Sequence, residues 1–242
     1  MTPEELATHF ERIRVCQRRI QLAVYRTRMA AAYHIGKARD MVADENRARR
    51  LTGIDDIAQL RTQLPPVIER IDHLNSLADA AWAELPRNTD KLTDYASQLA
   101  EAYDATHLKL RVYERLVRQT EKPLLADAEA ARDLPCEAQT RMSIERLLRM
   151  NIEDYVALES EIASNLGRID AERHAVVRAH RDLTDTYVRS TGRTDENSLA
   201  AGQHGVWLAT TQFDERQGYD FMDYASAWID RELDRVGQAG DS

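Results

Sequence analysis

Apolar side chains recur along this chain at intervals of three and four residues, which is the spacing of an α-helix with one buried face. The segment Thr2-Pro3-Glu4-Glu5 is a capping box with proline in the first turn, a strong signal for a helix start. The apolar positions from Phe10 to Met29 keep a helical period. We therefore expect one helix from residue 3 to about residue 46, with Gly53 as its stop signal.

Two more helical segments follow. The first covers 54–85, and we expect Pro65-Pro66 to interrupt it, because proline has no amide proton with which to continue a helix. The second is expected to begin at a cap on Thr89 or Asp90 and to end at Lys122-Pro123, since the residue before a proline avoids the helical conformation.

The remaining segments are also predicted to be helical. A short helix and a helix over 137–150 come first, and Asn151 is the expected cap of a long helix over 152–189. Two further helices flank a turn at 213–218. Nine glycines, few β-branched runs and abundant Ala, Leu, Glu and Arg agree with this pattern. The sequence therefore predicts an all-α fold, a multi-helix bundle of long helices.

The chain carries 33 Lys and Arg against 41 Asp and Glu, so its net charge is −8. That charge argues against a protein that binds duplex DNA through phosphate contacts alone, but not against a factor that a larger, basic partner delivers to DNA. No apolar run is long enough to cross a membrane, and the acidic N-terminus is unlike a signal peptide. Cys16 and Cys136 make no disulfide framework, so we expect a cytoplasmic protein without a membrane partner.

Seven histidines raise the question of a metal site. A ferritin-like di-metal site needs Glu-x-x-His on two helices and two further inward carboxylates, and the nearest match is Asp104-x-x-His107, alone. The simpler interpretation is that the histidines lie on the surface or are hydrogen-bonded in the core. The chain also has no P-loop, no G-x-S-x-G, no H-E-x-x-H and no cysteine pair at ligand spacing. We therefore expect no metal, no cofactor and no enzymatic activity.

The most distinctive segment is 202–235, in which a turn separates two predicted helices. Four aromatic residues within ten positions open the second of them. Phe221, Tyr224 and Trp228 share one face of that helix, whereas Tyr219 lies nearer the turn. A buried corner between two core helices is one interpretation of this pattern.

The same segment contains Gly-x-x-Gly, then Phe-Asp, then Gly-Tyr-x-Phe-x-x-Tyr-Ala-x-x-Trp-Ile. This pattern resembles region 2 of the sigma-70 family of bacterial transcription initiation factors. The resemblance covers roughly the last third of the chain and is weaker upstream of the glycines. The matching positions keep the family's order and spacing without a gap: Gly202, Gly205, Ala209, Phe213, Asp214, Gly218, Tyr219, Phe221, Tyr224, Ala225, Trp228 and Ile229.

The resemblance implies a division of the chain. Residues 151–237 are expected to form a sigma region 2-like helical domain, followed by a disordered tail over 238–242. Residues 1–150 form a helical N-terminal domain in the position of the non-conserved helical insertion that precedes region 2 in primary-type sigma factors.

In the family, region 2 docks on the clamp helices of the largest subunit of RNA polymerase and captures flipped bases of the non-template strand at the promoter −10 element. Aromatic faces replace base stacking there, and basic side chains hold phosphates. Phe213 and Phe221 match positions that more often support the core. The resemblance implies a DNA-binding set in this chain that comprises Tyr219, Tyr224, Trp228, Arg216 and Arg231.

The resemblance also implies a polymerase-binding side. The family usually shows Asp-Leu-Ile-Gln-Glu-Gly-Asn there, whereas this chain has Asn-Ser-Leu-Ala-Ala-Gly-Gln over 197–203. Ala200 and Ala201 replace the Gln-Glu pair, which removes hydrogen-bonding groups from this side. The polymerase-binding set comprises Asn197, Gln203, Val206 and Trp207.

Two departures from the family affect DNA binding. Ala227 stands where the family usually has the first of two adjacent tryptophans, and its loss removes a stacking surface worth roughly 1–3 kcal/mol. From Asp214 to Arg235 the chain has seven acids against three arginines. Because each carboxylate repels a phosphate, we expect binding to promoter DNA to be weak unless the chain is bound to polymerase.

Three hypotheses follow from these observations. The first is a divergent sigma-like initiation module that binds RNA polymerase core and engages the −10 element. The second is a sigma mimic or decoy that binds polymerase or a protein regulator without opening DNA. The third is a helical-bundle interaction protein whose last two helices converged on the pattern.

Overall fold

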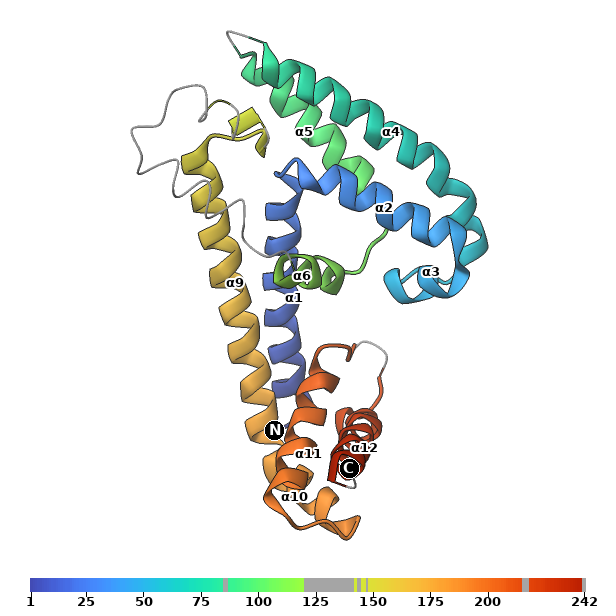
Figure 1. The fold of residues 1–242 in the computed structure, drawn as a ribbon, viewed down its shortest axis with the longest axis vertical. Helices are drawn as coiled ribbons and strands as arrows, with labels where there is room; N and C mark the ends of the chain where they lie inside the picture. The colour runs from blue at the N-terminus through green and yellow to red at the C-terminus, as the bar shows by residue number, and fades with distance from the viewer. Residues whose placement is uncertain (85–86, 120–141, 143–144, 147, 215–217, 241–242) are drawn as a thin grey trace. The chain divides into compact units, whose positions relative to one another are not determined.

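A computed structural model describes residues 1–84, 87–119, 142, 145, 146, 148–214 and 218–240 of the chain, with side chains described as far as residue 237. These residues form ten α-helices and no strand, apart from an isolated bridge between Thr52 and Leu108 (Figure 1). The predicted all-α fold is therefore confirmed. Among the same residues, no helix combines the length and the apolar character that crossing a membrane requires.

The chain divides into two compact units. One consists of Met1–Cys16 together with Leu166–Ser242, and the other of Gln17–Asn165. We call them the terminal unit and the central unit. This division differs from the expected boundary at residue 150, because the first turns of the chain pack with its C-terminal part. The boundaries fall inside two helices, α1 (Pro3–Tyr25) and α9 (Ile152–Ala179).

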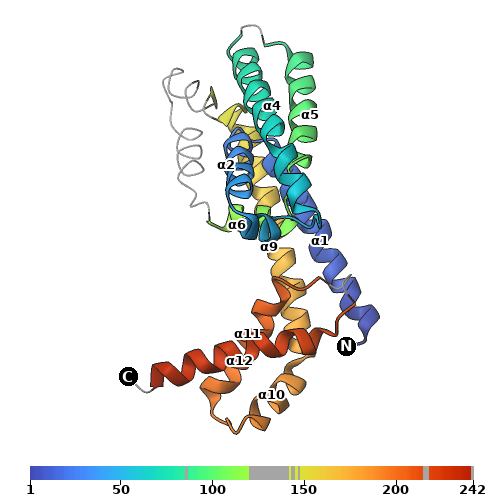
Figure 2. The same cartoon turned by 90° about the vertical axis from the view of Figure 1, so that its right-hand side faces the viewer.

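The central unit is built from antiparallel helices. Within it, α4 lies beside α2 and beside α5, as both views show (Figures 1 and 2). Its helices, besides the parts of α1 and α9 that belong to it, are α2 (Met29–Ala43), α3 (Glu45–Leu51), α4 (Ile57–Ala83), α5 (Thr89–Asp104) and α6 (Leu110–Gln119).

The single helix expected over residues 3–46 is instead three helices, which is a correction of the sequence prediction. The first break lies at 26–28, where the hydroxyl of Thr27 donates to the carbonyl of Val24 (2.7 Å). The second lies at Asp44, whose carboxylate caps α3 by accepting from the amides of Asn46 and Arg47. No glycine or proline marks either break, and the apolar residues keep their helical spacing across both. The sequence pattern therefore predicted one continuous helix.

The prolines in α4 do not interrupt it, contrary to the prediction. The helix continues through Pro65-Pro66, and both side chains are exposed. A proline leaves the carbonyl four residues earlier without its amide partner, here at Arg61 and Thr62. Because the prolines lie on the solvated side, water can hydrate those carbonyls.

The helix expected from residue 89 to residue 121 is also divided. Asn88, rather than Thr89 or Asp90, caps α5 by accepting from the amide of Lys91 (3.0 Å). The chain then turns at 105–109, where His107 has a positive φ of 54°. The short helix predicted before Pro135 lies outside the described residues, and the helix predicted over 137–150 lies mostly outside them.

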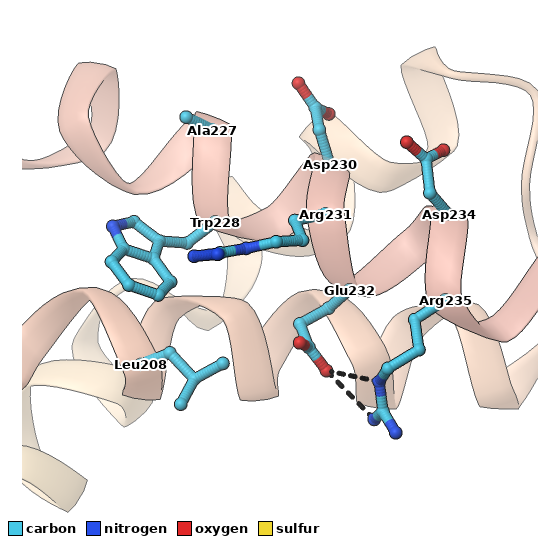
Figure 3. A pocket seen from close by; sticks show the side chains of 8 residues that line it. All are labelled: Leu208, Ala227, Trp228, Asp230, Arg231, Glu232, Asp234 and Arg235. Atoms are coloured by element: carbon cyan, nitrogen blue, oxygen red, sulfur yellow. Dashed lines mark hydrogen bonds and ion pairs between the residues drawn. The ribbon is translucent and has the colours of Figure 1, made fainter.

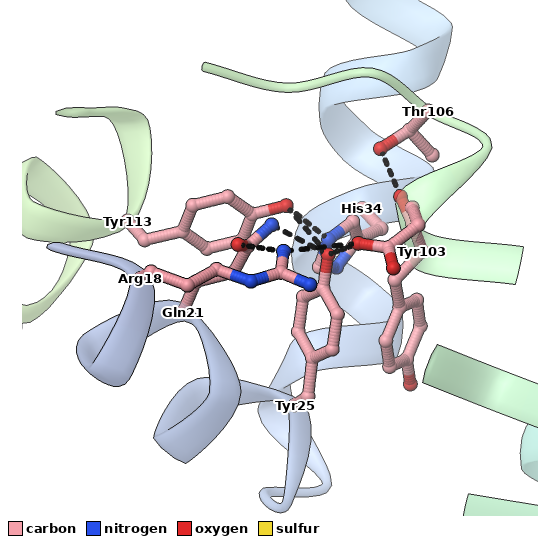
Figure 4. Close-up of polar contacts among 8 residues, drawn as sticks. Arg18, Gln21, Tyr25, His34, Tyr103, Thr106 and Tyr113 are labelled. Atoms are coloured by element: carbon pink, nitrogen blue, oxygen red, sulfur yellow. Dashed lines mark hydrogen bonds and ion pairs between the residues drawn. The ribbon is translucent and has the colours of Figure 1, made fainter. Parts of the chain in front are cut away.

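A hydrogen-bonded aromatic cluster fills part of the central unit (Figure 4). His34 is fully buried, and its Nδ1 must donate to the carbonyl of Ala30 (2.7 Å), since a carbonyl only accepts. Its Nε2 therefore accepts from the hydroxyl of Tyr113 (2.8 Å). Tyr103 stacks on the imidazole with ring centroids 4.2 Å apart. Burial lowers the pKa of His34 to about 4, so the imidazole is neutral near pH 7.

The terminal unit contains the predicted pair of helices around a turn. The long helix expected over 152–189 is divided at His180 into α9 and α10 (Arg181–Ser190). Next come α11 (Glu196–Thr210) and α12 (Phe221–Gly240), which pack against each other. Because α12 continues to Gly240, residues 238–240 are helical rather than part of the expected disordered tail, whose last two residues lie outside the described range.

Candidate functional site

The helix α12 has one buried side that attaches it to the terminal unit. Phe221, Ala225, Ile229 and Leu233 are all at most 2% exposed. They follow one another at intervals of four residues, so they form a single apolar row along the helix. Because this row is buried, it fixes the directions in which the remaining side chains of α12 point.

A second row on α12 combines aromatic and basic side chains. Tyr224 and Trp228 are partly exposed, and Arg231 and Arg235 continue the row at helical spacing. The guanidinium of Arg231 lies over the indole of Trp228, 4.3 Å from the ring centroid (Figure 3). Tyr219 precedes the helix and is 67% exposed. The structure thus leaves three of the predicted DNA-binding aromatic residues accessible and gives one of them an arginine neighbour.

The acids of α12 occupy a third row. Asp223, Asp230 and Asp234 are exposed and share this row with Ala227. Counted at 3.6 residues per turn, the acid row lies about 100° around the helix from the aromatic row and nearly opposite the buried one. Figure 3 shows the carboxylates of Asp230 and Asp234 on the side of α12 that faces away from Leu208 of α11. The acids therefore lie on a different row of α12 from Tyr224 and Trp228, although Asp230 and Asp234 line the same depression as Trp228.

An open depression of about 810 Å³ lies along α12 (Figure 3). It is shallow and mixed in character, which suits a flat, partly polar group better than a small apolar ligand. Its lining consists of Leu208 from α11 and, from α12, Ala227, Trp228, Asp230, Arg231, Glu232, Asp234 and Arg235.

Glu232 anchors the basic end of this depression. Its carboxylate is nearly buried and is paired with His204 (2.9 Å) and Arg235 (2.9 Å). The hydrogen bond from His204, and then the contact with Arg235, hold the pKa of Glu232 below its ordinary value despite the opposing effect of burial. Glu232 is therefore ionised near neutral pH and fixes the side chain of Arg235 beside α12.

The aromatic residues expected to support the core do so. Phe221 is buried, and its ring lies 5.1 Å from that of Phe213 and 5.0 Å from that of His180. Phe10 of α1 joins them, with its ring centroid 5.1 Å from Phe213 and 6.0 Å from Phe221. Sequence reasoning did not place Phe10 here. Its helical period indicated a buried side chain, but no local signal names the partner of that side chain.

The two glycines of the Gly-x-x-Gly pattern lie where helices touch. A Cβ on Gly205 would lie 2.6 Å from the Cα of Ile229, and a Cβ on Gly202 would lie 2.5 Å from a methyl group of Val188. Glycine therefore lets α11 approach α12 and α10 closely. This geometry gives the glycines a packing role whether or not the surface binds a partner.

The predicted polymerase-binding residues differ in accessibility. Asn197 is exposed in the first turn of α11, and Gln203 is partly exposed with its amide near Asp185 (3.4 Å). Trp207 is partly exposed and lies 4.6 Å, centroid to centroid, from the ring of His174. Val206 is fully buried, so the prediction that it contacts polymerase is corrected, and it belongs to the core of the terminal unit.

One predicted DNA contact, Arg216, lies outside the described residues. Among the residues that are described, no group of three or more His, Cys, Asp and Glu side chains comes together in a way that could hold a metal ion.

Comparison with known proteins does not place the chain in a family. No protein-family model matches it, and no curated protein matches it either.

Proposed function

We propose that this chain is a sigma-like initiation module that binds RNA polymerase core and engages the non-template strand of the promoter −10 element. The cytoplasm is where such a factor acts. The observation that carries the proposal is the aromatic row of α12, in which Tyr224 and Trp228 remain partly exposed beside Tyr219. These are the positions at which the resemblance to sigma region 2 requires aromatic faces.

The surface suits an unpaired base. A flipped base loses the stacking of its neighbours, which costs a few kcal/mol, and an aromatic face returns roughly 1–3 kcal/mol for each base stacked on it. Arg231 adds a cation over one face of the Trp228 indole, and that positive charge attracts the phosphates of a strand on this row. The acid row lies about 100° around α12 from the aromatic row, which reduces its repulsion of a strand on that row, but Asp230 and Asp234 repel a phosphate placed in the depression that they share with Trp228.

In this proposal, RNA polymerase supplies the positive charge near DNA that the terminal unit lacks. The terminal unit, residues 1–16 and 166–242, carries 11 basic and 17 acidic residues, a net charge of −6. Unaided capture of DNA by this unit is therefore weak, and a basic partner that holds the strand nearby raises its effective concentration.

The test has two stages. The purified chain is first mixed with RNA polymerase core, and complex formation is measured by gel filtration at low salt. A fluorescent single-stranded −10 oligonucleotide is then titrated into the complex. We expect Tyr219→Ala and Trp228→Ala to weaken binding by roughly 1–3 kcal/mol each, while leaving the complex with core intact.

A matched control is Tyr95→Ala, which removes a partly exposed tyrosine from α5 of the central unit. Binding of the oligonucleotide should be unchanged by this substitution. The proposal is wrong if the chain does not associate with core, or if Tyr95→Ala weakens oligonucleotide binding as much as Trp228→Ala does.

The decoy hypothesis is the second candidate, and α11 supports it. Ala201, at the second position of the family's Gln-Glu pair, is nearly buried, and Val206 is fully buried. The polar groups that remain for a partner helix on this side are few, and Gln203 is already oriented toward Asp185. A decoy binds polymerase or a regulator but leaves the −10 strand free, so the oligonucleotide titration distinguishes the two candidates.

A further inference from the structure

A basic surface lies on the central unit and shares no residue with the candidate site on α11 and α12. The segments 44–50 and 109–118 carry seven Lys and Arg against three Asp and Glu, a local charge of +4 in a chain of net charge −8. The two segments are about sixty positions apart, so the sequence alone does not join them. We call their cations the α3–α6 basic surface, which comprises Arg47, Arg49, Arg50, Lys109, Arg111, Arg115 and Arg118.

Backbone contacts hold the two segments together. The amide of Lys109 donates to the carbonyl of Leu51 (2.9 Å), beside the isolated bridge between Thr52 and Leu108. The ammonium of Lys109 also donates to the carbonyl of Arg49 (3.2 Å). The C-terminal end of α3 therefore meets the start of α6, which brings Lys109 of one segment beside Arg49 of the other.

The first turn of α6 is also fixed against α2. The hydroxyl of Tyr33 donates to the carbonyl of Val112 (3.2 Å). Burial raises the pKa of Tyr33 to about 12, and the nearby positive charge of Arg115 opposes that rise. Val112, Tyr113 and Glu114 form the buried side of α6. The arginines at 111, 115 and 118 consequently share the opposite side and extend over about 10 Å at 1.5 Å per residue.

The acids within these segments neutralise only part of the charge. Glu45 pairs with Arg49, and Asp44 lies 3.6 Å from Arg47, which also pairs with Asp40. These pairs are accessible to solvent, so they contribute little and exchange readily with another anion. Arg118 differs, because it pairs with the buried carboxylate of Glu114 (2.9 Å). Arg50 and Arg115 are exposed, and neither has a carboxylate partner among the described residues.

We infer that the α3–α6 basic surface binds the phosphate backbone of duplex DNA. A protein partner would be expected to meet an apolar centre. The described residues of 44–51 and 109–118 contain no exposed large hydrophobic side chain, because their apolar residues are buried or partly buried. A surface of exposed arginines without an apolar centre fits a row of like charges, which a phosphate backbone provides.

The net charge of −8 limits this binding but does not prevent it. At physiological salt the Debye length is about 8 Å, so acids elsewhere on the chain are screened from a phosphate at this surface. The expected mode is weak, independent of base sequence and strongly dependent on salt. The inference does not rest on the proposed function, because it concerns different residues in the central unit.

The test measures binding of the full chain, without polymerase, to a short fluorescent DNA duplex over a range of salt concentrations. The decisive variant is Arg50→Gln/Arg115→Gln, because neither arginine takes part in a described ion pair whose loss would unfold the chain. We expect its affinity at low salt to fall about tenfold, and the slope of log K against log salt to become less negative by about 2.

The matched control is Arg19→Gln/Arg39→Gln, which makes the same change in net charge with two exposed arginines of α1 and α2. Its affinity and slope should stay close to those of the unaltered chain. The variant Arg50→Lys/Arg115→Lys keeps the charge and should keep most of the binding. Circular dichroism and the midpoint of thermal unfolding establish that each variant is folded.

Several outcomes would overturn the inference. One is an unaltered chain that shows no salt-dependent binding to the duplex. Another is an equal loss of affinity in the variant at 50 and 115 and in the variant at 19 and 39, which indicates an effect of net charge alone. The third is a loss of binding to RNA polymerase core but not to DNA in the first variant, which assigns the surface to an acidic protein.

Discussion

A Cβ built on Gly205 lies 2.6 Å from the Cα of Ile229, closer than two such atoms approach in folded proteins. The neighbouring atom belongs to the backbone of α12, so it cannot rotate away as a side chain could. This contact sets the distance between α11 and α12, and the exposure of Trp228 depends on how α12 is seated.

The substitution Gly205→Ala should therefore destabilise the chain. Forcing a methyl group into this contact costs roughly 1–3 kcal/mol, which exceeds the gain of up to about 1 kcal/mol from replacing glycine in a helix. Chemical denaturation followed by circular dichroism measures the change. Gly167→Ala is the control, because a Cβ on Gly167 meets nothing within 4 Å, and it should stabilise α9. Equal changes in the unfolding free energy of the two variants would contradict the close packing at Gly205.

Phe10 should matter for the stability of the terminal unit. It is 3% exposed and lies against both Phe213 and Phe221, so Phe10→Ala removes a buried ring and should cost roughly 3–5 kcal/mol. Val15→Ala on the same helix is the control, because Val15 is 43% exposed and its truncation should change the unfolding free energy by less than about 1 kcal/mol. Denaturant titration measures the unfolding midpoint of each variant, and similar midpoints for both variants would refute the packing role of Phe10.

Ala227 offers a gain-of-function prediction that depends on the proposed function. It is exposed on α12, so a larger side chain fits there without displacing the core. Ala227→Trp restores the missing aromatic surface and should tighten binding of the −10 oligonucleotide to the polymerase complex by roughly 1–3 kcal/mol. Ala96→Trp, at an exposed position on α5, is the control for an added indole. No tightening by Ala227→Trp, or equal tightening by both, would count against base capture on α12.

The buried imidazole of His34 should make the central unit sensitive to acid. Burial lowers its pKa to about 4 from the ordinary value of about 6.5, so the unfolded chain binds a proton there between these values and the folded chain does not. Stability due to neutral His34 is therefore fully present above about pH 6.5 and is lost as pH falls toward about 4. The full effect is roughly 3 kcal/mol.

The measurement compares the unfolding free energy of the unaltered chain and of His34→Gln across this pH range. Glutamine does not titrate, so the variant should be less stable at neutral pH but should lose less stability on acidification. Carboxylates titrate in both proteins and cancel in the difference. Parallel pH profiles would show that His34 binds a proton equally well in the folded and unfolded chain.

Part of the candidate site could be predicted from local pattern. Tyr224, Trp228 and Arg231 recur at helical spacing, but the sequence placed Phe221 on their face, and the structure assigns it to the separate buried row. Other features of the site could be recognised only from the tertiary structure. Val206 looked like a surface contact, and only packing shows that its helix turns this side chain inward. The pairing of Glu232 with His204 joins two helices and has no signature in either.

The sequence by itself determined that the chain is helical and that α11 and α12 flank a turn. These properties depend on neighbours within a few positions, which periodicity records. Tertiary structure alone decided that Phe10 packs with the C-terminal helices, that α3 meets α6, and where long helical periods break. Those outcomes depend on contacts between residues far apart in the chain, and their free energy appears only when the surfaces come together.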